Sequence, residues 1–277
     1  MLKLMYITNN PQVAHIAEQY GVDYVWIDLE TMGKEERQKG IDSVKSHHKI
    51  SDIRACREVL TTSNMLVRIN PWNAFSTNEI NEVIEAGAQT IMLPMWKTAD
   101  EVTNFINAIN GRAKNILLLE TKEAEEALDD VLKIKGIDAI HIGLNDLHLS
   151  YGLTFMFELL ANGTVERIVS KIKKVGIPYG FGGIAKIGEG IIPAEKLITE
   201  HYRLGSNMAI LSRTFCDAVC DNDLSKIENV FANEIVKIRN CEKLAAKMSE
   251  QAFNANHQNV CDCVNSAVYA IKEKRYA

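Results

Sequence analysis

The sequence predicts one α/β fold, a (β/α)8 TIM barrel followed by a C-terminal helical extension. The first observation is an alternation of β-rich apolar runs and helical patterns over 277 residues, a length typical of one such barrel. The second is a weak internal repeat in which glycine precedes an apolar run. Glycine suits the joint between a helix and the next strand because it adopts the left-handed conformation without steric cost. The copies are GVDYVWIDLE (21–30), GAQTIMLPM (87–95), GIDAIHIGLND (136–146) and LGSNMAILS (204–212).

Four further apolar runs bring the number of predicted strands to eight. Helical patterns lie between the strands, with apolar residues three and four positions apart, as in Ile80, Val83 and Ile84. Eight alternations close a barrel, and an open doubly wound sheet is the alternative. The further runs are 2–7, 65–69, 115–119 and 177–181.

After residue 222 the pattern becomes helical. We therefore expect a barrel domain over 1–222 and a C-terminal helical extension over 223–277. An apolar stripe in the extension covers either the barrel's own outer wall or a neighbouring subunit, so a homo-oligomer is expected. The polar stretch 250–265 predicts a linker before a last short helix. The stripe consists of Leu224, Ile227, Val230, Phe231, Ile235 and Ile238.

The composition favours a protein that acts on small molecules. The formal charge is -5 and the pI is about 5.9, which gives no electrostatic reason to expect nucleic acid or an anionic membrane as a partner. The N-terminus lacks the pattern of a signal peptide, and no apolar stretch is long enough to span a membrane, so a cytoplasmic location is expected. The six cysteines lack the spacing of a zinc ribbon or a disulfide framework and are expected to be reduced.

Two carboxylates are predicted at the mouth of the barrel. Glu120 follows the run NILLL and Asp146 follows AIHIGLN, and the reacting groups of such barrels lie where the strands end. Two like charges in one cleft repel each other unless a cation or a proton intervenes. Oxygen ligands suit Mg²⁺ or Mn²⁺. The alternative is that each carboxylate caps the helix that follows it.

Arg68, in the segment LVRINP, is a charge at the end of an otherwise apolar strand. Such an arginine needs an anionic partner, either a substrate or a structural ion pair with Asp28 or Glu30. The segment Gly143-Leu144-Asn145 predicts a turn before Asp146 whose backbone N–H groups bind a substrate carboxylate.

The segments IDLE, VRINP, GAQTIMLPM, LLLET and IGLNDL, in this order, resemble the HpcH/HpaI aldolase and citrate lyase family over about residues 1–220. The resemblance implies a (β/α)8 barrel, hexamers built from dimers, and Mg²⁺, Mn²⁺ or another divalent ion that holds a 2-oxo acid or an acyl thioester. It implies that Glu120 and Asp146 are the metal ligands, that Arg68 stabilises an enolate oxygen, and that residues 143–146 bind the substrate carboxylate.

The chain departs from the family pattern at Thr31. Aldolases of the family carry a histidine there, which acts with the aspartate that matches Asp28 to activate water or the substrate hydroxyl. Threonine cannot act as a base near neutral pH. The family's usual Pro-Ala is also replaced, by Leu144 and Asn145, which reshapes the carboxylate pocket. The residues that remain as candidates for the base are Glu30, His47, His48 and His148.

The expected function is that of a divalent-metal-dependent carbon–carbon lyase, a class II aldolase acting on a 2-oxo acid such as a 4-hydroxy-2-oxo acid, through an enolate. One alternative is oxaloacetate decarboxylation, which needs no base at position 31, or Claisen chemistry like that of citrate lyase or citrate synthase. A second alternative is a non-catalytic barrel used for binding. The joint presence of Arg68, Glu120 and Asp146 speaks against this last interpretation.

Overall fold

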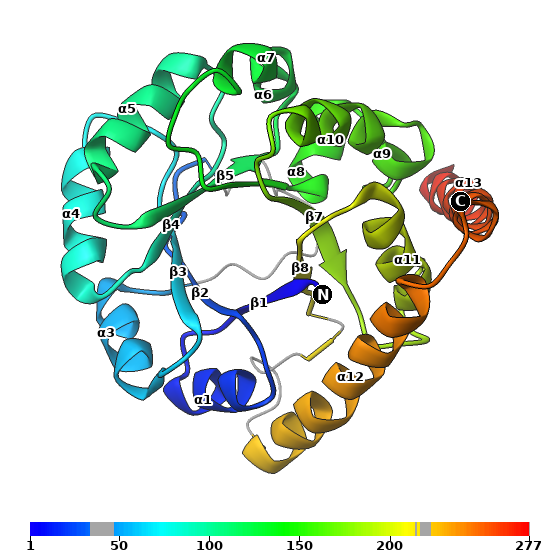
Figure 1. Cartoon of the computed structure of the whole chain (residues 1–277), viewed down its shortest axis with the longest axis horizontal. Coiled ribbons are helices and arrows are strands. Elements are labelled where there is room, and N and C mark those ends of the chain that lie inside the picture. Colours follow the sequence, from blue (N-terminus) through cyan, green and yellow to red (C-terminus); the bar gives the residue numbers. More distant parts are fainter. Residues whose placement is uncertain (34–46, 214, 217–222, 277) are drawn as a thin grey trace.

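The computed structural model describes residues 1–33, 47–213, 215–216 and 223–276 (Figure 1). The strands are β1 (Lys3–Ile7), β2 (Tyr24–Asp28), β3 (Asn64–Arg68), β4 (Thr90–Leu93), β5 (Lys114–Leu119), β6 (Ala139–Ile142), β7 (Tyr179–Ile184) and β8 (Met208–Leu211). The helices are α1 (Pro11–Gln19), α3 (Ile50–Val59), α4 (Ser76–Ala86), α5 (Ala99–Ile109), α6 (Lys122–Glu126), α7 (Leu128–Val131), α8 (Leu144–Ser150), α9 (Glu158–Ala161), α10 (Thr164–Lys174), α11 (Ala194–Leu204), α12 (Leu224–Ala245) and α13 (Glu250–Tyr276).

The eight strands form a closed parallel barrel in sequence order, which confirms the predicted fold class. Each strand pairs with the next, and β8 pairs with β1 through Lys3 and Met208. The register between β2 and β3 places Asp28 beside Arg68. Figure 1 shows the helices arranged around this ring of strands. The strand ends therefore meet at one mouth of the barrel, as the sequence predicts.

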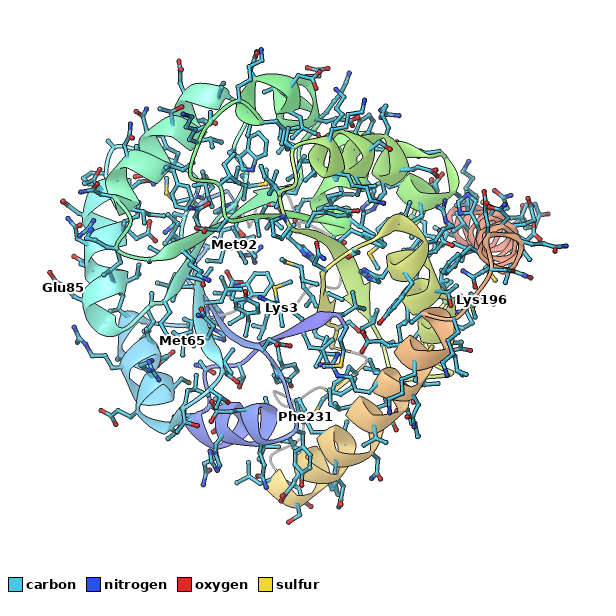
Figure 2. The ribbon with its side chains drawn as sticks, in the orientation of Figure 1. Lys3, Met65, Glu85, Met92, Lys196 and Phe231 are labelled. Atoms are coloured by element: carbon cyan, nitrogen blue, oxygen red, sulfur yellow. The ribbon has the colours of Figure 1, made fainter. Side chains whose placement is uncertain are left out.

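Side chains alternate between the barrel interior and the layer under the helices, as the pleat of a strand requires. The interior side chains form a core of their own, which includes Trp26, Met92 and Leu118. The outward side chains pack against the helices in the larger core, which includes Met65. Figure 2 shows Met92 inside the ring of strands and Met65 on the helix side of its strand. The alternation decides which polar residues near the strand ends face a ligand.

The glycines of the internal repeat lie between four strands and the helices that precede them. Gly21, Gly87, Gly136 and Gly205 all have positive φ, between 73° and 112°. Gly87 and Gly205 are the left-handed C-caps of α4 and α11. A side chain at these positions would be strained, so the repeat marks the joints between helices and strands.

The apolar stripe of α12 covers the barrel's own wall. Ile227, Phe231, Ile235 and Ile238 are buried, and α12 packs against α1 and α11. The Phe231 ring meets the rings of Tyr6 and Phe215 edge to face, with centroids 5.0 Å and 5.3 Å away. The helix therefore completes the outer layer between the first and last strands. The domain boundary at residue 222 stays a prediction.

Helix α12 also joins the two ends of the barrel sequence. The Glu242 carboxylate accepts a hydrogen bond of 2.5 Å from the backbone N–H of Leu2. Arg239 donates to the Leu2 carbonyl at 2.8 Å and forms an ion pair of 2.7 Å with Glu242. The start of β1 is thus held by side chains from more than two hundred residues away.

The predicted linker over 250–265 was wrong, because α13 is one continuous helix. It packs against α11 and α9 and buries Val260 and Val264. The Asn256 side chain donates to the Lys196 carbonyl at 3.1 Å and to Glu200 at 3.0 Å. Tertiary contacts therefore stabilise a helix that its polar sequence does not predict.

No helix in the described part of the chain combines the length and the apolar character that crossing a membrane requires.

Candidate active site

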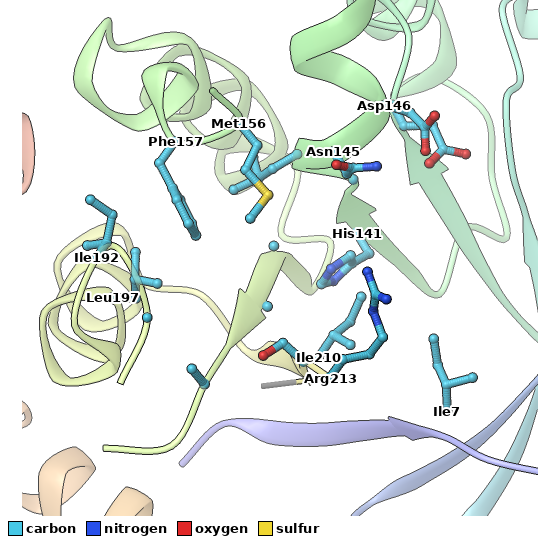
Figure 3. Close-up of a pocket in the computed structure, with 18 of the residues that line it drawn as sticks. Ile7, His141, Asn145, Asp146, Met156, Phe157, Ile192, Leu197, Ile210 and Arg213 are labelled. Atoms are coloured by element: carbon cyan, nitrogen blue, oxygen red, sulfur yellow. The ribbon is translucent and has the colours of Figure 1, made fainter. Parts of the chain in front are cut away.

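A cavity of about 660 Å³ lies at the C-terminal ends of the barrel strands. Its lining includes Arg68 at the end of β3, Glu120 directly after β5, and Asp146 in the first turn of α8. Figure 3 shows Asp146 and Phe157 on opposite sides of this cavity. Its charged lining groups come from strand ends, where a barrel of this type carries its reacting groups.

Glu120 and Asp146 converge, as predicted, from neighbouring strand ends. Glu120 is buried, and the cost of burying its charge, together with repulsion from Asp146, raises its pKa well above the usual range. The positive charge of Arg68 opposes this shift. The backbone N–H of Met95 donates to the Glu120 carboxylate at 3.1 Å, from a residue with φ of 53°. Glu120 and Asp146 therefore repel each other at a position where the Glu120 carboxylate is poorly solvated.

Arg68 is held by two buried carboxylates. Its Nε and Nη2 donate to the two oxygens of Asp28, both at 2.8 Å, and Nη1 lies 3.3 Å from Glu30. The guanidinium carbon also lies 5.2 Å from the centre of the Trp26 ring. Burial opposes the charged form, but the nearby carboxylates outweigh it and raise the pKa of Arg68. The sequence offered two partners for Arg68, a substrate or a structural ion pair with Asp28 or Glu30. The ion pair is present in the structure, and Arg68 also lines the cavity.

Because Gly143 has no side chain, Glu120 fits beside the start of α8. A Cβ atom at this position would lie 2.8 Å from a carboxylate oxygen of Glu120 and 2.9 Å from its Cβ. The sequence predicts that the Gly143 N–H binds a substrate carboxylate. In the structure it instead donates to the Leu119 carbonyl in the sheet at 2.9 Å. Leu144 and Asn145 line the cavity and supply first-turn N–H groups, which have no acceptor within their own helix.

The residues considered as the base lie away from the cavity lining. Thr31 is exposed, and its N–H and hydroxyl donate to Asn70. His48 accepts a hydrogen bond of 3.0 Å from the Asp28 N–H, and His148 contacts the Leu144 carbonyl at 3.2 Å. Glu30 pairs with Arg68, and His47 is exposed. None of these described residues lines the cavity.

The cavity lining includes Ser212 and Arg213, which were not predicted from the sequence, and two buried residues that were not predicted either, His141 and Trp26. Both point into the barrel, because Trp26 lies two positions before Asp28 and His141 lies two positions before Gly143. His141 is fully buried, and burial lowers its pKa to about 4, partly opposed by the backbone of Gly182. Counting in steps of two along each predicted strand would have found both residues.

We expect acid to destabilise the fold partly through His141. Its pKa is about 4 in the folded protein and about 6.5 in an unfolded chain. The contribution is therefore fully present above pH 6.5 and is lost as pH falls toward 4, because the unfolded chain binds a proton that the folded chain does not. Between pH 7.5 and 4.5 the loss is about 2 kcal/mol at about 1.4 kcal/mol per pKa unit.

Urea unfolding at these two pH values, in metal-free buffer, measures this loss. The His141→Phe variant lacks the titrating group. Between pH 7.5 and pH 4.5 the free energy of unfolding of this variant should therefore fall by about 2 kcal/mol less than that of the parent protein. Other groups cancel in the comparison except His201, whose pKa is lowered mainly by burial and partly by His141. An equal loss in both proteins would contradict the prediction.

Comparisons with known proteins agree with this fold and site. The sequence profile of the HpcH/HpaI aldolase/citrate lyase family matches residues 3–179. A 2-keto-3-deoxy-L-rhamnonate aldolase from Escherichia coli O17:K52:H18 is 27% identical to the chain, over 40% of the chain and 53% of the relative. The chain thus spans about half the length of the curated relatives that it matches.

Two solved structures show the same fold at low sequence identity. An HpcH/HpaI aldolase from Desulfitobacterium hafniense DCB-2 has a TM-score of 0.59 and 16% identity, over 76% of this chain and 86% of that one. The citrate synthase SbnG has a TM-score of 0.60 and 16% identity, over 82% and 92%. The profile match covers well over half of the sequence, including the strands that carry Asp28, Arg68 and Glu120. The chain therefore belongs to the HpcH/HpaI aldolase/citrate lyase family.

Proposed function

We propose that this chain is a divalent-metal-dependent lyase that cleaves a carbon–carbon bond in a 2-oxo acid, such as a 4-hydroxy-2-oxo acid. The observation that carries the proposal is the coupled pair Glu120 and Asp146 in a cavity that also contains Arg68. Family membership supports a lyase of the aldolase type.

The acid pair fits Mg²⁺ or Mn²⁺. A cation would relieve the repulsion that raises the pKa of Glu120. Among the residues that the structure describes, no group of three or more His, Cys, Asp and Glu side chains is placed to hold a metal ion. Two carboxylates leave room for water and substrate oxygens, as Mg²⁺ prefers. A bound dication would polarise the substrate carbonyl and so ease cleavage of the nearby bond.

Arg68 would place a positive charge beside the substrate oxygen that becomes negative as the bond breaks. Asp28 binds two of its nitrogens and Glu30 contacts the third, so the guanidinium is held in one orientation. Such preorganised charge costs little reorganisation during the reaction. We therefore assign charge stabilisation to Arg68 and positioning of Arg68 to Asp28 and Glu30.

Backbone N–H groups of the first turn of α8 would bind the substrate carboxylate. Leu144 and Asn145 line the cavity beside the acid pair, and the N-terminal turn of a helix favours an anion. Gly143 contributes by leaving space for Glu120.

Decarboxylation of oxaloacetate is the second candidate. Thr31 is exposed and bound to Asn70, and none of the candidate bases lines the cavity. Loss of carbon dioxide needs an electron sink but no base to remove a hydroxyl proton. The same feature favours Claisen chemistry less strongly, because that reaction must remove a proton from carbon.

We also infer a small-molecule substrate, a cytoplasmic location and a homo-oligomer, either a dimer or a hexamer. The net charge of -5 supports a small molecule over nucleic acid. Large apolar side chains on the last two helices support contacts between subunits, since Val236 is 57% exposed, Leu244 67% and Tyr269 68%.

The test is pyruvate release from 4-hydroxy-2-oxopentanoate and from oxaloacetate by the purified chain, after chelation and again after addition of Mn²⁺ or Mg²⁺. We expect the protein to cleave the hydroxy acid, and we expect added metal to raise the rate at least about a hundredfold over that of the chelated protein. Release from oxaloacetate alone would favour the decarboxylase. The chain with Glu120→Ala serves as the blank for metal-catalysed background. No metal-dependent turnover of either compound would refute the proposed lyase activity.

A further inference from the structure

Two buried polar groups face the cavity without a hydrogen-bond partner among the described residues. One is the indole nitrogen of Trp26, and the other is the imidazole of His141, whose nitrogens form no well-aligned hydrogen bond although the backbone of Gly182 lies close enough to raise its pKa slightly. Trp26 is 2% exposed and His141 is 0% exposed, yet both line the cavity. Buried polar groups in folded proteins are nearly always paired, so an unpaired set in a cavity indicates a missing ligand or ordered water.

The two rings project from opposite walls of the barrel. Trp26 lies on β2 and His141 on β6, four strands apart in a closed ring of eight. Figure 3 shows the His141 ring in the middle of the lining, with Asn145 and Asp146 on one side of it and Ile210 on the other. The cavity therefore extends from the acid pair toward the barrel interior.

Local packing holds each ring in place. His141 is in register with Gly180 on β7, where a Cβ atom would lie 2.9 Å from its Nδ1, so only glycine admits the ring here. The Trp26 ring is covered by the guanidinium of Arg68 at 5.2 Å. Neither ring is free to turn toward solvent, and their polar atoms are presented to the cavity at fixed places.

The chemistry of the two groups defines the atom that they bind. An indole N–H only donates, and a neutral imidazole offers one donor and one acceptor. Because its pKa is lowered to about 4, His141 stays neutral near pH 7 and is a poor base. The matching partner is an uncharged oxygen: a carbonyl would accept from both rings, and a hydroxyl would accept from Trp26 and either donate to His141 or accept from it.

We propose that Trp26 and His141 bind a hydroxyl or carbonyl oxygen of the substrate, on the part of the molecule that leaves as the aldehyde. This inference rests on the proposed lyase function. Phe155, Phe157 and Ile192 also line the cavity, together with the polar side chains of Asn145, Ser212 and Arg213. The substrate class is therefore a 2-oxo acid that carries an oxygen function on the fragment that leaves as the aldehyde.

The test compares Trp26→Phe and His141→Phe with the parent in the cleavage of 4-hydroxy-2-oxopentanoate. We expect KM to rise at least tenfold in each variant, whereas the inhibition constant of pyruvate, which lacks the C4 hydroxyl, stays within twofold. The melting temperature without ligand should stay equal or rise, because each change removes an unpaired buried group. The matched control is His201→Phe, a second buried histidine, which bonds Ser206 at 2.8 Å outside the cavity and should leave KM unchanged.

Unchanged KM in both variants would overturn the proposal and leave water as the partner of these groups. Equal changes in KM and in the pyruvate constant would also overturn it, because they indicate a general distortion of the site. If the parent protein cleaves nothing, the proposed function fails, and calorimetric binding of the same hydroxy acid to the parent and the variants still tests the inference. Binding that both variants weaken at least tenfold would then support it, and equal or absent binding would refute it.

Discussion

Replacement of both Glu120 and Asp146 by alanine is expected to abolish binding of Mn²⁺ and to lower kcat/KM at least about a thousandfold. The two carboxylates are the candidate protein ligands, and without them none of the described residues that line the cavity carries a carboxylate to balance a dication beside Arg68. Burial raises the pKa of Glu120, so its removal relieves an unfavourable contact in the metal-free chain. The variant should therefore unfold at the same temperature as the metal-free parent, or a higher one. Calorimetric titration with Mn²⁺ and thermal unfolding measure the two effects.

The matched control replaces two acids outside the cavity, Glu123 and Asp129, by alanine. Their side chains are 49% and 68% exposed and pair with lysines at the surface, where such pairs contribute little. This control should bind Mn²⁺ and turn over like the parent. Equal Mn²⁺ binding by the parent and the Glu120/Asp146 variant would contradict the assigned ligands and favour the interpretation as a non-catalytic barrel.

Arg68→Met is expected to reduce both catalysis and stability. Asp28 and Glu30 are each 2% exposed, and the substitution removes the guanidinium that pairs with both of these buried carboxylates. Removal of one partner from a buried ion pair typically costs about 3–5 kcal/mol. Loss of the charge that faces the substrate should lower kcat by about two to three orders of magnitude. Urea unfolding and steady-state kinetics separate the two losses.

The double substitution Arg68→Met with Asp28→Asn separates the structural role of Arg68 from its catalytic role. Neutralising Asp28 removes much of the buried negative charge, so stability should recover by about 1–3 kcal/mol relative to Arg68→Met. Activity should not recover, because the charge beside the substrate is still missing. Recovery of activity together with stability would show that Arg68 acts only through the fold.

The sequence predicted the barrel because its signals are local. A glycine at a helix end and an apolar run after it report on the backbone of a few residues, and Gly21, Gly87, Gly136 and Gly205 all adopt the expected conformation. Helix α13 was missed because its stability comes from contacts with α11 and α9, which a polar sequence does not reveal.

The site was predicted in part. Strand ends placed Glu120, Asp146 and Arg68 around one cavity, since the carboxyl ends of parallel strands meet. Two facts depend on three-dimensional packing. The pairing of Arg68 with Asp28 and Glu30 follows from the register of β2 against β3. The unpaired state of His141 follows from all of its neighbours at once, so no pattern in one segment predicts it.

The bridge from α12 to the first strand has a consequence for biosynthesis. Arg239 and Glu242, the partners of Leu2, are translated more than two hundred residues after it. Contacts so distant along the chain form slowly, because a long loop must close first. The β1 segment therefore lacks these contacts while more than two hundred further residues are translated, which makes it the expected binding place for a chaperone.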